Sequence, residues 1–187
     1  HKFIKSQMNN FENVGYNIIY QKIIKEQSIM EEKFNEKIKI NGKITEGNDV
    51  FDQLVTDKPL RKTIGKLFHD GHHARAVEEA FKFIDNLVKN TAQPSDANLT
   101  GAKLMTCAFS PNTPLLKINA GETASERDEQ NGYMQILSGC MTGIRNPRAH
   151  ESNWEDSEQH ALQLIIWANH LVERIRMSEK TEASKHP

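Results

Sequence analysis

The stretch GIRNPRAHE, residues 143–151, brings arginine, asparagine and histidine together within six positions. His150 is the type of side chain that gives and takes a proton near neutral pH. Arg145 carries a permanent charge on a planar fork that matches two phosphate oxygens, and Asn146 can orient a hydroxyl or a phosphate. Together they suit the attack of a ribose 2′-hydroxyl on the adjacent phosphate, which needs acid–base help and stabilisation of developing negative charge. That chemistry requires no metal ion.

Pro147 decides whether these side chains can meet. In a straight α-helix, Arg145 and His150 would point about 140° away from each other. Proline lacks an N–H and disfavours the helical conformation of the residue before it, so we expect the preceding helix to stop near Arg145, with Asn146 as an N-cap and Pro147 opening a new turn. That bend would turn Arg145, Asn146 and His150 towards one cavity. A purely structural interpretation stands beside it, in which Asn146 caps a helix, His150 bonds a backbone carbonyl and Arg148 pairs with a glutamate.

Helices must position this motif. Apolar residues recur every three to four positions and predict amphipathic helices over residues 1–40, 60–70, 72–90, 102–109, 125–144 and 158–177. Ser125, with Asp128, and Ser157 are the expected N-caps of the last two helices. An alternating stretch around Asn41-Gly42 predicts a small β-hairpin near residues 38–46. These elements predict a mostly all-α fold class, a helical bundle with one hairpin.

Bulk properties restrict the classes of function. The 187 residues fit one domain with an appendage, and a net charge of −1 excludes a global basic field that would attract nucleic acid. Any nucleic-acid site must therefore be local or be built from two chains. Cys107 and Cys140 each lie in an apolar helical pattern without a second ligand at metal spacing, which favours reduced thiols. No apolar run approaches the ~20 residues of a membrane span, and no signal-peptide pattern opens the chain, so we expect a cytoplasmic protein without a membrane segment.

The HDGHH stretch, residues 69–73, tempts a metal interpretation, since it holds three histidines and an aspartate. Gly71 splits it between one helix end and the next helix start, and no pair at i, i+4 faces inward. We therefore predict no metal site here. Asp70 and His72 are candidates for helix caps or for the lining of a cleft beside the motif.

Other polar and aromatic residues have a structural and a functional interpretation. Glu78 and Glu79 suit a solvated helix face, although one of them could hold Arg145 in place. A basic cluster in residues 58–66 suits either solvent exposure or contact with RNA phosphates. Trp167 lies beside an apolar stripe and is predicted to be core, whereas Trp154 lies in a loop and is a candidate for a ligand or dimer contact.

The stretch IRNPRAHE resembles the Arg-X4–6-His motif of the HEPN superfamily, helical domains named for higher eukaryotes and prokaryotes nucleotide-binding. The wider pattern resembles the Ymh-type family of uncharacterised, often phage- or defence-associated proteins, itself HEPN-like. It runs from LFHDGHHARAVEEAFKFIDNLV through GAKLMTCAFSPNTPLLKIN to DEQNGYMQILSGCMTGIRNPRAH. The similarity spans about residues 58–176 and implies three parts: a variable N-terminal helical region with the hairpin (1–57), a HEPN-like domain (58–176) and a flexible tail (177–187).

The resemblance implies a homodimer in which two Arg145/His150 sets line one cleft. It also implies a metal-independent endoribonuclease without a cofactor, in a toxin or antiviral defence system, with a possible antitoxin or defence-complex partner. Arg145 would bind the scissile phosphate, His150 would act as general acid or base, and Asn146 would assist. Members silenced by nucleotidylation carry a tyrosine two residues after the histidine; Ser152 stands there, so that control is not expected.

Two alternatives of other classes remain open. One is a catalytically silent HEPN-like module that binds RNA, a nucleotide or a partner protein; the other is a structural subunit of a defence complex, in which residues 1–57 do the important work. Further candidates for substrate binding, whichever function holds, are Arg148, Asp70, His72 and Trp154.

Overall fold

Amphipathic helices dominate the part of the chain that this computed structural model describes, residues 47–181. The chain divides into two units, His1–Gly47 and Asn48–Pro187, and the described residues belong almost entirely to the second. The mostly helical fold class is confirmed there. The helix predicted over residues 1–40 and the hairpin predicted near residues 38–46 lie outside the described residues.

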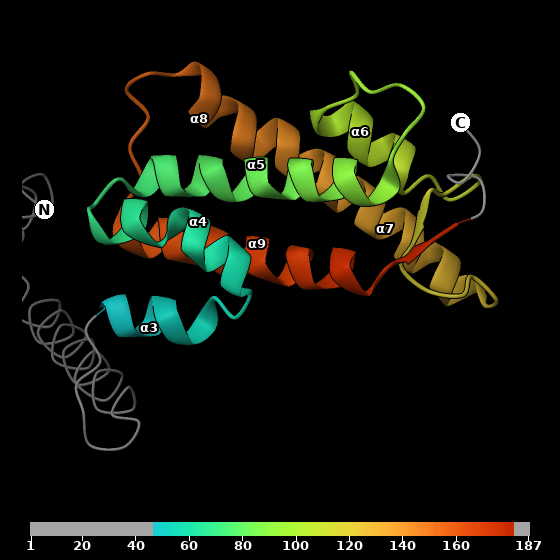
Figure 1. Cartoon of the computed structure of the whole chain (residues 1–187), viewed down its shortest axis with the longest axis horizontal. Coiled ribbons are helices and arrows are strands. Elements are labelled where there is room, and N and C mark those ends of the chain that lie inside the picture. The colour runs from blue at the N-terminus through green and yellow to red at the C-terminus, as the bar shows by residue number, and fades with distance from the viewer. Residues whose placement is uncertain (1–46, 182–187) are drawn as a thin grey trace, which may run out of the picture. The chain divides into compact units, whose positions relative to one another are not determined.

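The described elements follow the predicted pattern of amphipathic segments. The helices are α3 (Gly47–Leu54), α4 (Lys58–His69), α5 (His73–Ala92), α6 (Gly101–Ala108), α7 (Ala124–Cys140), α8 (Asn146–His150) and α9 (Glu158–Met177), and a π-helical segment, η2 (Met141–Arg145), joins α7 to α8. In Figure 1, α5 lies in the middle of this bundle, with α4 and α9 below it, α6 and α8 above it, and α7 sloping past its end. Helix α5 therefore carries the central face of the core.

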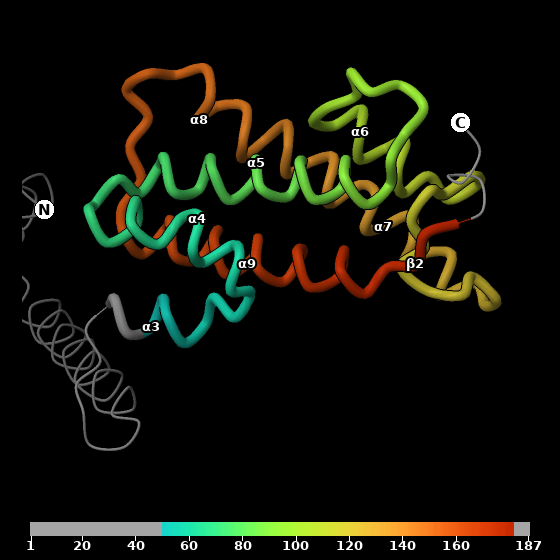
Figure 2. The backbone as a smooth tube through the Cα atoms, viewed as in Figure 1, coloured from blue at the N-terminus to red at the C-terminus, as the bar shows by residue number. Residues whose placement is uncertain are grey.

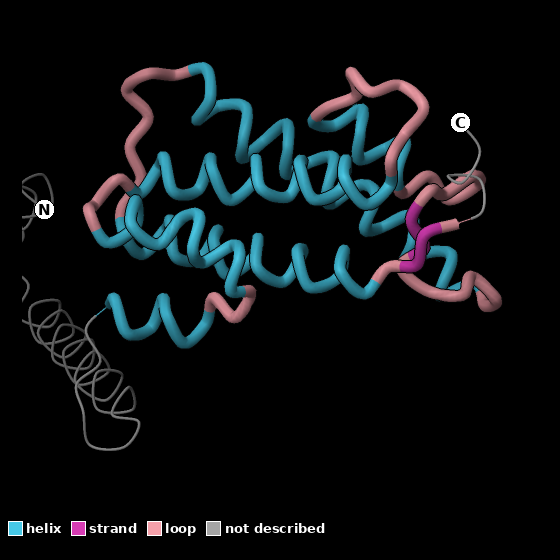
Figure 3. The backbone as a smooth tube through the Cα atoms, viewed as in Figure 1, coloured by secondary structure: helices cyan, strands magenta, loops and turns pink. Residues whose placement is uncertain are grey.

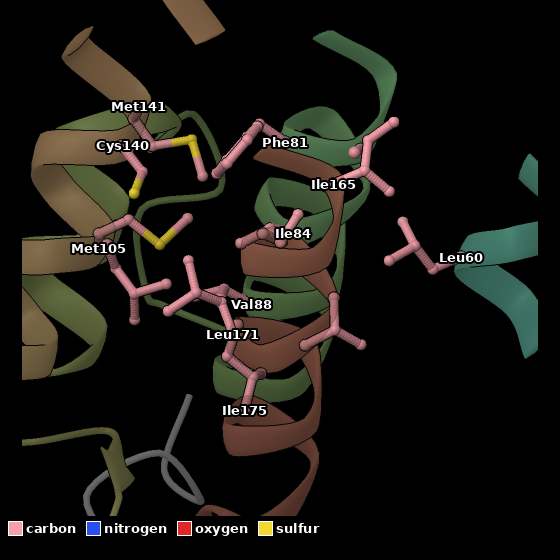
Figure 4. Close-up of a cluster of buried hydrophobic side chains, with 14 of the residues drawn as sticks. Leu60, Phe81, Ile84, Val88, Met105, Cys140, Met141, Ile165, Leu171 and Ile175 are labelled. Atoms are coloured by element: carbon pink, nitrogen blue, oxygen red, sulfur yellow. The ribbon is translucent and has the colours of Figure 1, made fainter. Parts of the chain in front are cut away.

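The core fills the space around α5. Phe81, Ile84 and Val88 of α5 point towards Met105 of α6 and Met141 of η2 (Figure 4), and all five are fully buried. Because the first residue of η2 takes part in this core, the start of the π-helical segment is fixed by apolar packing.

The apolar core includes residues before position 58, the position at which the sequence similarity suggested that the HEPN-like domain starts. Phe51 of α3 and Val55 are fully buried, and the Phe51 ring stacks on Phe68 with ring centroids 4.6 Å apart. At least these residues of the region assigned to 1–57 therefore pack with the helical bundle.

A short antiparallel strand pair joins the end of the described chain to the loop before α7. Strand β1 (Leu116–Lys117) pairs with β2 (Glu179–Lys180), next to the end of α9 (Figure 2). The Thr181 hydroxyl also donates to the Pro114 carbonyl at 2.8 Å. In the segment that the sequence assigns to a tail, backbone hydrogen bonds hold residues 179–181 without apolar burial.

Helix starts show where local capping signals are decisive. Ser157 caps α9 as predicted, its hydroxyl accepting from the His160 N–H at 3.3 Å. The predicted cap of α7 at Ser125 is wrong: Thr123 caps that helix, and the Glu126 carboxylate accepts a hydrogen bond from the Thr123 N–H at 2.9 Å. This reciprocal pair satisfies two free N–H groups at once, which a cap at Ser125 would leave open.

Candidate functional site

The motif lies in a continuous helical rod. Helix α7, η2 and α8 follow one another without an interruption (Figure 3), and Asn146 has helical angles, φ −62° and ψ −43°. The first extended residue is Glu151, with φ −100° and ψ 109°. The predicted break, with Asn146 as an extended N-cap, is therefore wrong: the helix ends after His150.

Pro147 explains why the rod widens instead of breaking. In a regular α-helix its ring would collide with the carbonyl of Gly143, four residues earlier, and it offers no N–H to that carbonyl. In η2 the Asn146 N–H instead donates to the Met141 carbonyl, five residues back. The wider turn accommodates one extra residue, and such single-turn π segments occur frequently at functional sites.

Arg145, the last residue of η2, is a half-buried cation without a carboxylate partner in the described part of the chain. Its Nη1 donates to the Asn146 side-chain oxygen at 3.0 Å. Its Nε is buried and has no hydrogen-bond partner, a property that the Nε of Arg174 shares. A buried N–H donor without an acceptor lowers the stability of the folded protein by about 1–3 kcal/mol, so binding of a ligand that accepts this hydrogen bond would be favourable. Arg145 and Asn146 together therefore present a positive group suited to an anion.

His150 ends α8 and is exposed. Among the side chains that the structure describes, none forms a hydrogen bond or ion pair with its ring. Because Arg145 and His150 lie five helical residues apart, helix geometry separates their directions by about 140°. The predicted bend that would bring both into one cavity is absent, so the Arg145 and His150 of one chain diverge.

Glu78 and Glu79 do not form the solvated face that the sequence suggested, nor does either hold Arg145. Glu78 is buried, and its carboxylate accepts from Arg75 at 2.7 Å and from Lys82 at 2.8 Å. Glu79 pairs with the same two cations, at 2.7 Å and 3.2 Å. The two carboxylates are thus neutralised by two cations on the same helix, α5. Neither carboxylate pairs with Arg145, whose positive charge can therefore bind another anion.

Arg148 is buried and fully engaged inside the protein. Its Nε and Nη2 donate to the two carboxylate oxygens of Asp156 at 2.7 Å and 2.8 Å, and its Nη1 donates to the Ile144 carbonyl at 2.8 Å. Trp154 covers the guanidinium, with 5.3 Å from the Arg148 Cζ to the ring centroid. The partner is an aspartate rather than the predicted glutamate. The pair ties the loop after His150 back to the rod.

The structure brings two further candidates, His72 and Trp154, into one pocket of about 380 Å³ between the start of α5 and the loop before α9. Arg75 and Asp156 also line it. Asp70 lies outside this lining and ends α4, where a hydrogen bond from Lys66 lowers the pKa of its carboxyl below the ordinary value. None of Arg145, Asn146 and His150 lines the pocket, so it is separate from the motif.

Other features concern metals, thiols and membranes. Within residues 47–181, no three histidine, cysteine, aspartate or glutamate side chains gather into a set that could hold a metal ion. Both cysteines are free, and burial raises the pKa of the Cys140 thiol, while a hydrogen bond from Trp167 opposes that shift. Among the described helices, none has the length and apolar character needed to cross a bilayer.

Sequence reasoning missed the surface role of one residue. Trp167 was predicted to be core, but 38% of it is exposed. It lies at the edge of the apolar stripe of α9, next to the buried Ala168, and that edge faces outwards. The spacing signals the boundary of the stripe but not which side of the boundary a residue occupies.

Comparison with known proteins places the chain in a family. The sequence model of Hypoth_Ymh, described as a protein of unknown function, matches residues 54–175. The chain belongs to the Hypoth_Ymh family. The match begins at the last residue of α3 and ends near the end of α9, so it includes the whole motif-bearing rod. No curated protein and no solved structure matched the chain.

The resemblance to the Ymh-type family seen in the sequence is thereby confirmed. The Hypoth_Ymh assignment carries no activity with it, and its relation to the HEPN superfamily stays a prediction based on the Arg-X4–6-His motif. The function must be argued from the site itself.

Proposed function

We propose that this Hypoth_Ymh protein is a metal-independent endoribonuclease of HEPN type that acts as a homodimer, in the cytoplasm, within a toxin or antiviral defence system. The observation that carries the proposal is Arg145, a cation on a π-helical segment that has no carboxylate partner among residues 47–181 and has a buried, unpaired Nε. The resemblance of residues 143–151 to the Arg-X4–6-His motif supports the same chemistry.

The divergence of Arg145 and His150 makes a second copy part of this proposal. One chain cannot direct both side chains at one phosphate, because about 140° of helix rotation separates them. Two copies that meet around the motif would place the Arg145 of one chain beside the His150 of the other. The exposed position of His150 at the end of α8 is compatible with that contact.

In the proposed reaction, Arg145 binds the non-bridging oxygens of the scissile phosphate and Asn146 orients it. The His150 of the other copy removes the proton from the ribose 2′-hydroxyl, and the 2′-oxygen forms a bond to phosphorus. The bond from phosphorus to the 5′-oxygen breaks, that leaving oxygen takes a proton from water, and His150 releases its proton to solvent. The products are a 2′,3′-cyclic phosphate and a 5′-hydroxyl, and no group outside the two chains is consumed.

The test uses mixed single-stranded RNA in EDTA with four proteins: the parent, Arg145→Ala, His150→Ala and His160→Ala. His160 is the matched control, since it is also exposed and lies at the start of the next helix. We expect the parent and His160→Ala to cleave alike, leaving cyclic-phosphate ends. His150→Ala should lose about 100-fold or more, the usual contribution of a general acid or base. Equal cleavage by all four, or by none, contradicts the proposal.

A second candidate is a catalytically silent module that binds RNA, a nucleotide or a partner protein through Arg145. The divergence of Arg145 and His150 within one chain favours it, because anion binding needs only the arginine. Filter binding separates the two: a silent module would lose RNA binding in Arg145→Ala, keep it in His150→Ala, and cleave in neither.

A further inference from the structure

A row of four planar side chains links α9 to α7. The row, called here the aromatic seam, consists of Trp167, His170, Tyr133 and Arg174 in that order. The Trp167 and His170 rings stack with centroids 5.3 Å apart and planes 17° apart. The Tyr133 hydroxyl shares a hydrogen bond of 2.9 Å with His170 Nε2, and the Arg174 guanidinium lies 5.0 Å from the Tyr133 ring centroid.

Each member of the seam is held in place. Glu129 accepts from Arg174 at 2.7 Å, which closes the far end of the row. At the other end, the Trp167 indole lies near enough to the buried Cys140 thiol to influence its pKa, and the His170 ring covers one face of the indole. Trp167 is nevertheless 38% exposed, and no second ring stacks on it within the described residues. The seam therefore ends in a rigid, open aromatic surface.

The seam lies close to the motif in the chain. Cys140, whose thiol pKa Trp167 influences, is the residue directly before η2, and Arg145 is the last residue of η2. One wide helical turn thus separates the contact of Trp167 from the cation that would bind the scissile phosphate.

We propose that Trp167 is a stacking platform for an unpaired base of single-stranded RNA beside the phosphate held at Arg145. The inference deepens the proposed function and rests on it. Base–aromatic stacking is tolerant of sequence and needs only one open, fixed ring, which the seam supplies. A protein partner fits less well, because a stable interface covers about 800 Å² per partner. Among the described residues, the large apolar side chains on or one helical turn from the seam that are more than a third exposed are Trp167, Ile136 and Met177, which together are far smaller than such an interface.

The test measures binding separately from cleavage. A fluorescent single-stranded DNA oligonucleotide has stackable bases but no 2′-hydroxyl, so the proposed reaction cannot consume it. Its anisotropy gives the Kd of the parent and of Trp167→Ala, Trp167→Leu and Trp167→Phe. Loss of one stacked base should raise the Kd roughly ten-fold or more in the alanine and leucine variants. Phenylalanine keeps a flat ring and should retain most of the affinity.

Two controls sharpen the comparison. Ile136→Ala removes an equally exposed apolar side chain from the same surface and should leave the Kd within about two-fold, because an aliphatic group offers no flat ring for stacking. The duplex form of the oligonucleotide should bind without regard to residue 167, since its bases already stack on one another. Helix content by circular dichroism and sedimentation velocity are recorded for each variant.

Every outcome decides the proposal. A parent that binds no single strand, or variants that all bind alike, overturns it. A loss of dimer in Trp167→Ala overturns it too, because the occupant of the seam is then a second copy of the chain. If Trp167 governs binding but the parent cleaves no RNA, the platform stands and the nuclease proposal fails. If His150 governs cleavage but Trp167 does not affect binding, the nuclease stands and the platform fails.

Discussion

Replacing Asp156 by asparagine should destabilise the protein by about 3 kcal/mol, since it leaves the buried Arg148 guanidinium without its countercharge. Asparagine has the same shape, so the change removes charge rather than volume. Its oxygen still accepts one of the two hydrogen bonds that Arg148 makes to Asp156. Its NH₂ group faces the other guanidinium N–H and cannot accept from it.

The expected loss of about 3 kcal/mol follows from the burial of the Arg148–Asp156 ion pair. The Arg148 and Asp156 side chains are only 4% and 3% exposed, and their two hydrogen bonds measure 2.7 Å and 2.8 Å. Exposed ion pairs contribute about 0–1 kcal/mol, whereas removal of one partner of a buried pair costs about 3–5 kcal/mol. The low end of the second range applies, because Arg148 keeps its bond to the Ile144 carbonyl and its contact with Trp154.

Urea unfolding at about pH 7, followed by helix content, measures the free energy of unfolding of parent and variant. Glu155→Gln is the matched control: the residue is adjacent in the same loop and exposed, so its change should stay within about 0.5 kcal/mol. The double variant Arg148→Met, Asp156→Leu removes both charges. It should be more stable than Asp156→Asn, because no charge is then left buried and unpaired.

A loss below about 1 kcal/mol in Asp156→Asn would refute this reasoning, since the pair would then behave as an exposed ion pair. So would a double variant less stable than the single one, because the cost would then come from lost contacts rather than from an orphaned charge.

Two further predictions concern the rod. Deleting Gly143 removes the extra residue of η2 and forces Pro147 into a regular helix, which should cost about 3 kcal/mol. Adding Pro147→Ala should recover most of that loss in urea unfolding, and no recovery would contradict the steric account. The backbone hydrogen bond to Thr123, chiefly, holds the pKa of the Glu126 carboxyl below its ordinary value. The thermal midpoint of Glu126→Ala should therefore lie below that of the parent at about pH 6, and the difference should vanish as acid protonates Glu126; a difference independent of pH would contradict this.

Local signals in the sequence predicted the helices and one of their caps. The apolar stripe of α5, from Ala76 to Val88, repeats every three to four residues and is buried as expected. Ser157 as the cap of α9 follows from its own side chain, and the same rule would have found Thr123 through Glu126 three residues later. These features depend on residues within one turn of each other, which is why sequence alone can specify them.

The buried charges could be predicted only in part. The ion pairs on α5 could be predicted, because their members lie three or four residues apart in the sequence: Arg75, Glu78, Glu79 and Lys82. The burial of Glu78 could not be predicted from this spacing. Asp156 lies eight positions from Arg148 across a loop, and no periodic pattern links the two. Its role depends on how the loop folds back on the rod, which is a tertiary property.

The π-helical segment shows why the motif was predicted to break the helix and does not. From the neighbouring sequence alone, a proline inside a helix predicts either a break before it or a kink. Neither prediction takes account of the residues after the proline. In a regular α-helix, Met141 and Arg148 are seven residues apart and share a face, so Arg148 would point into the apolar core that Met141 fills. The extra residue in η2 rotates Arg148 by about 100° relative to that face, the rotation of one helical residue. The same wide turn that accommodates Pro147 therefore keeps an arginine out of the core, where its charge would be unpaired, and turns it towards Asp156.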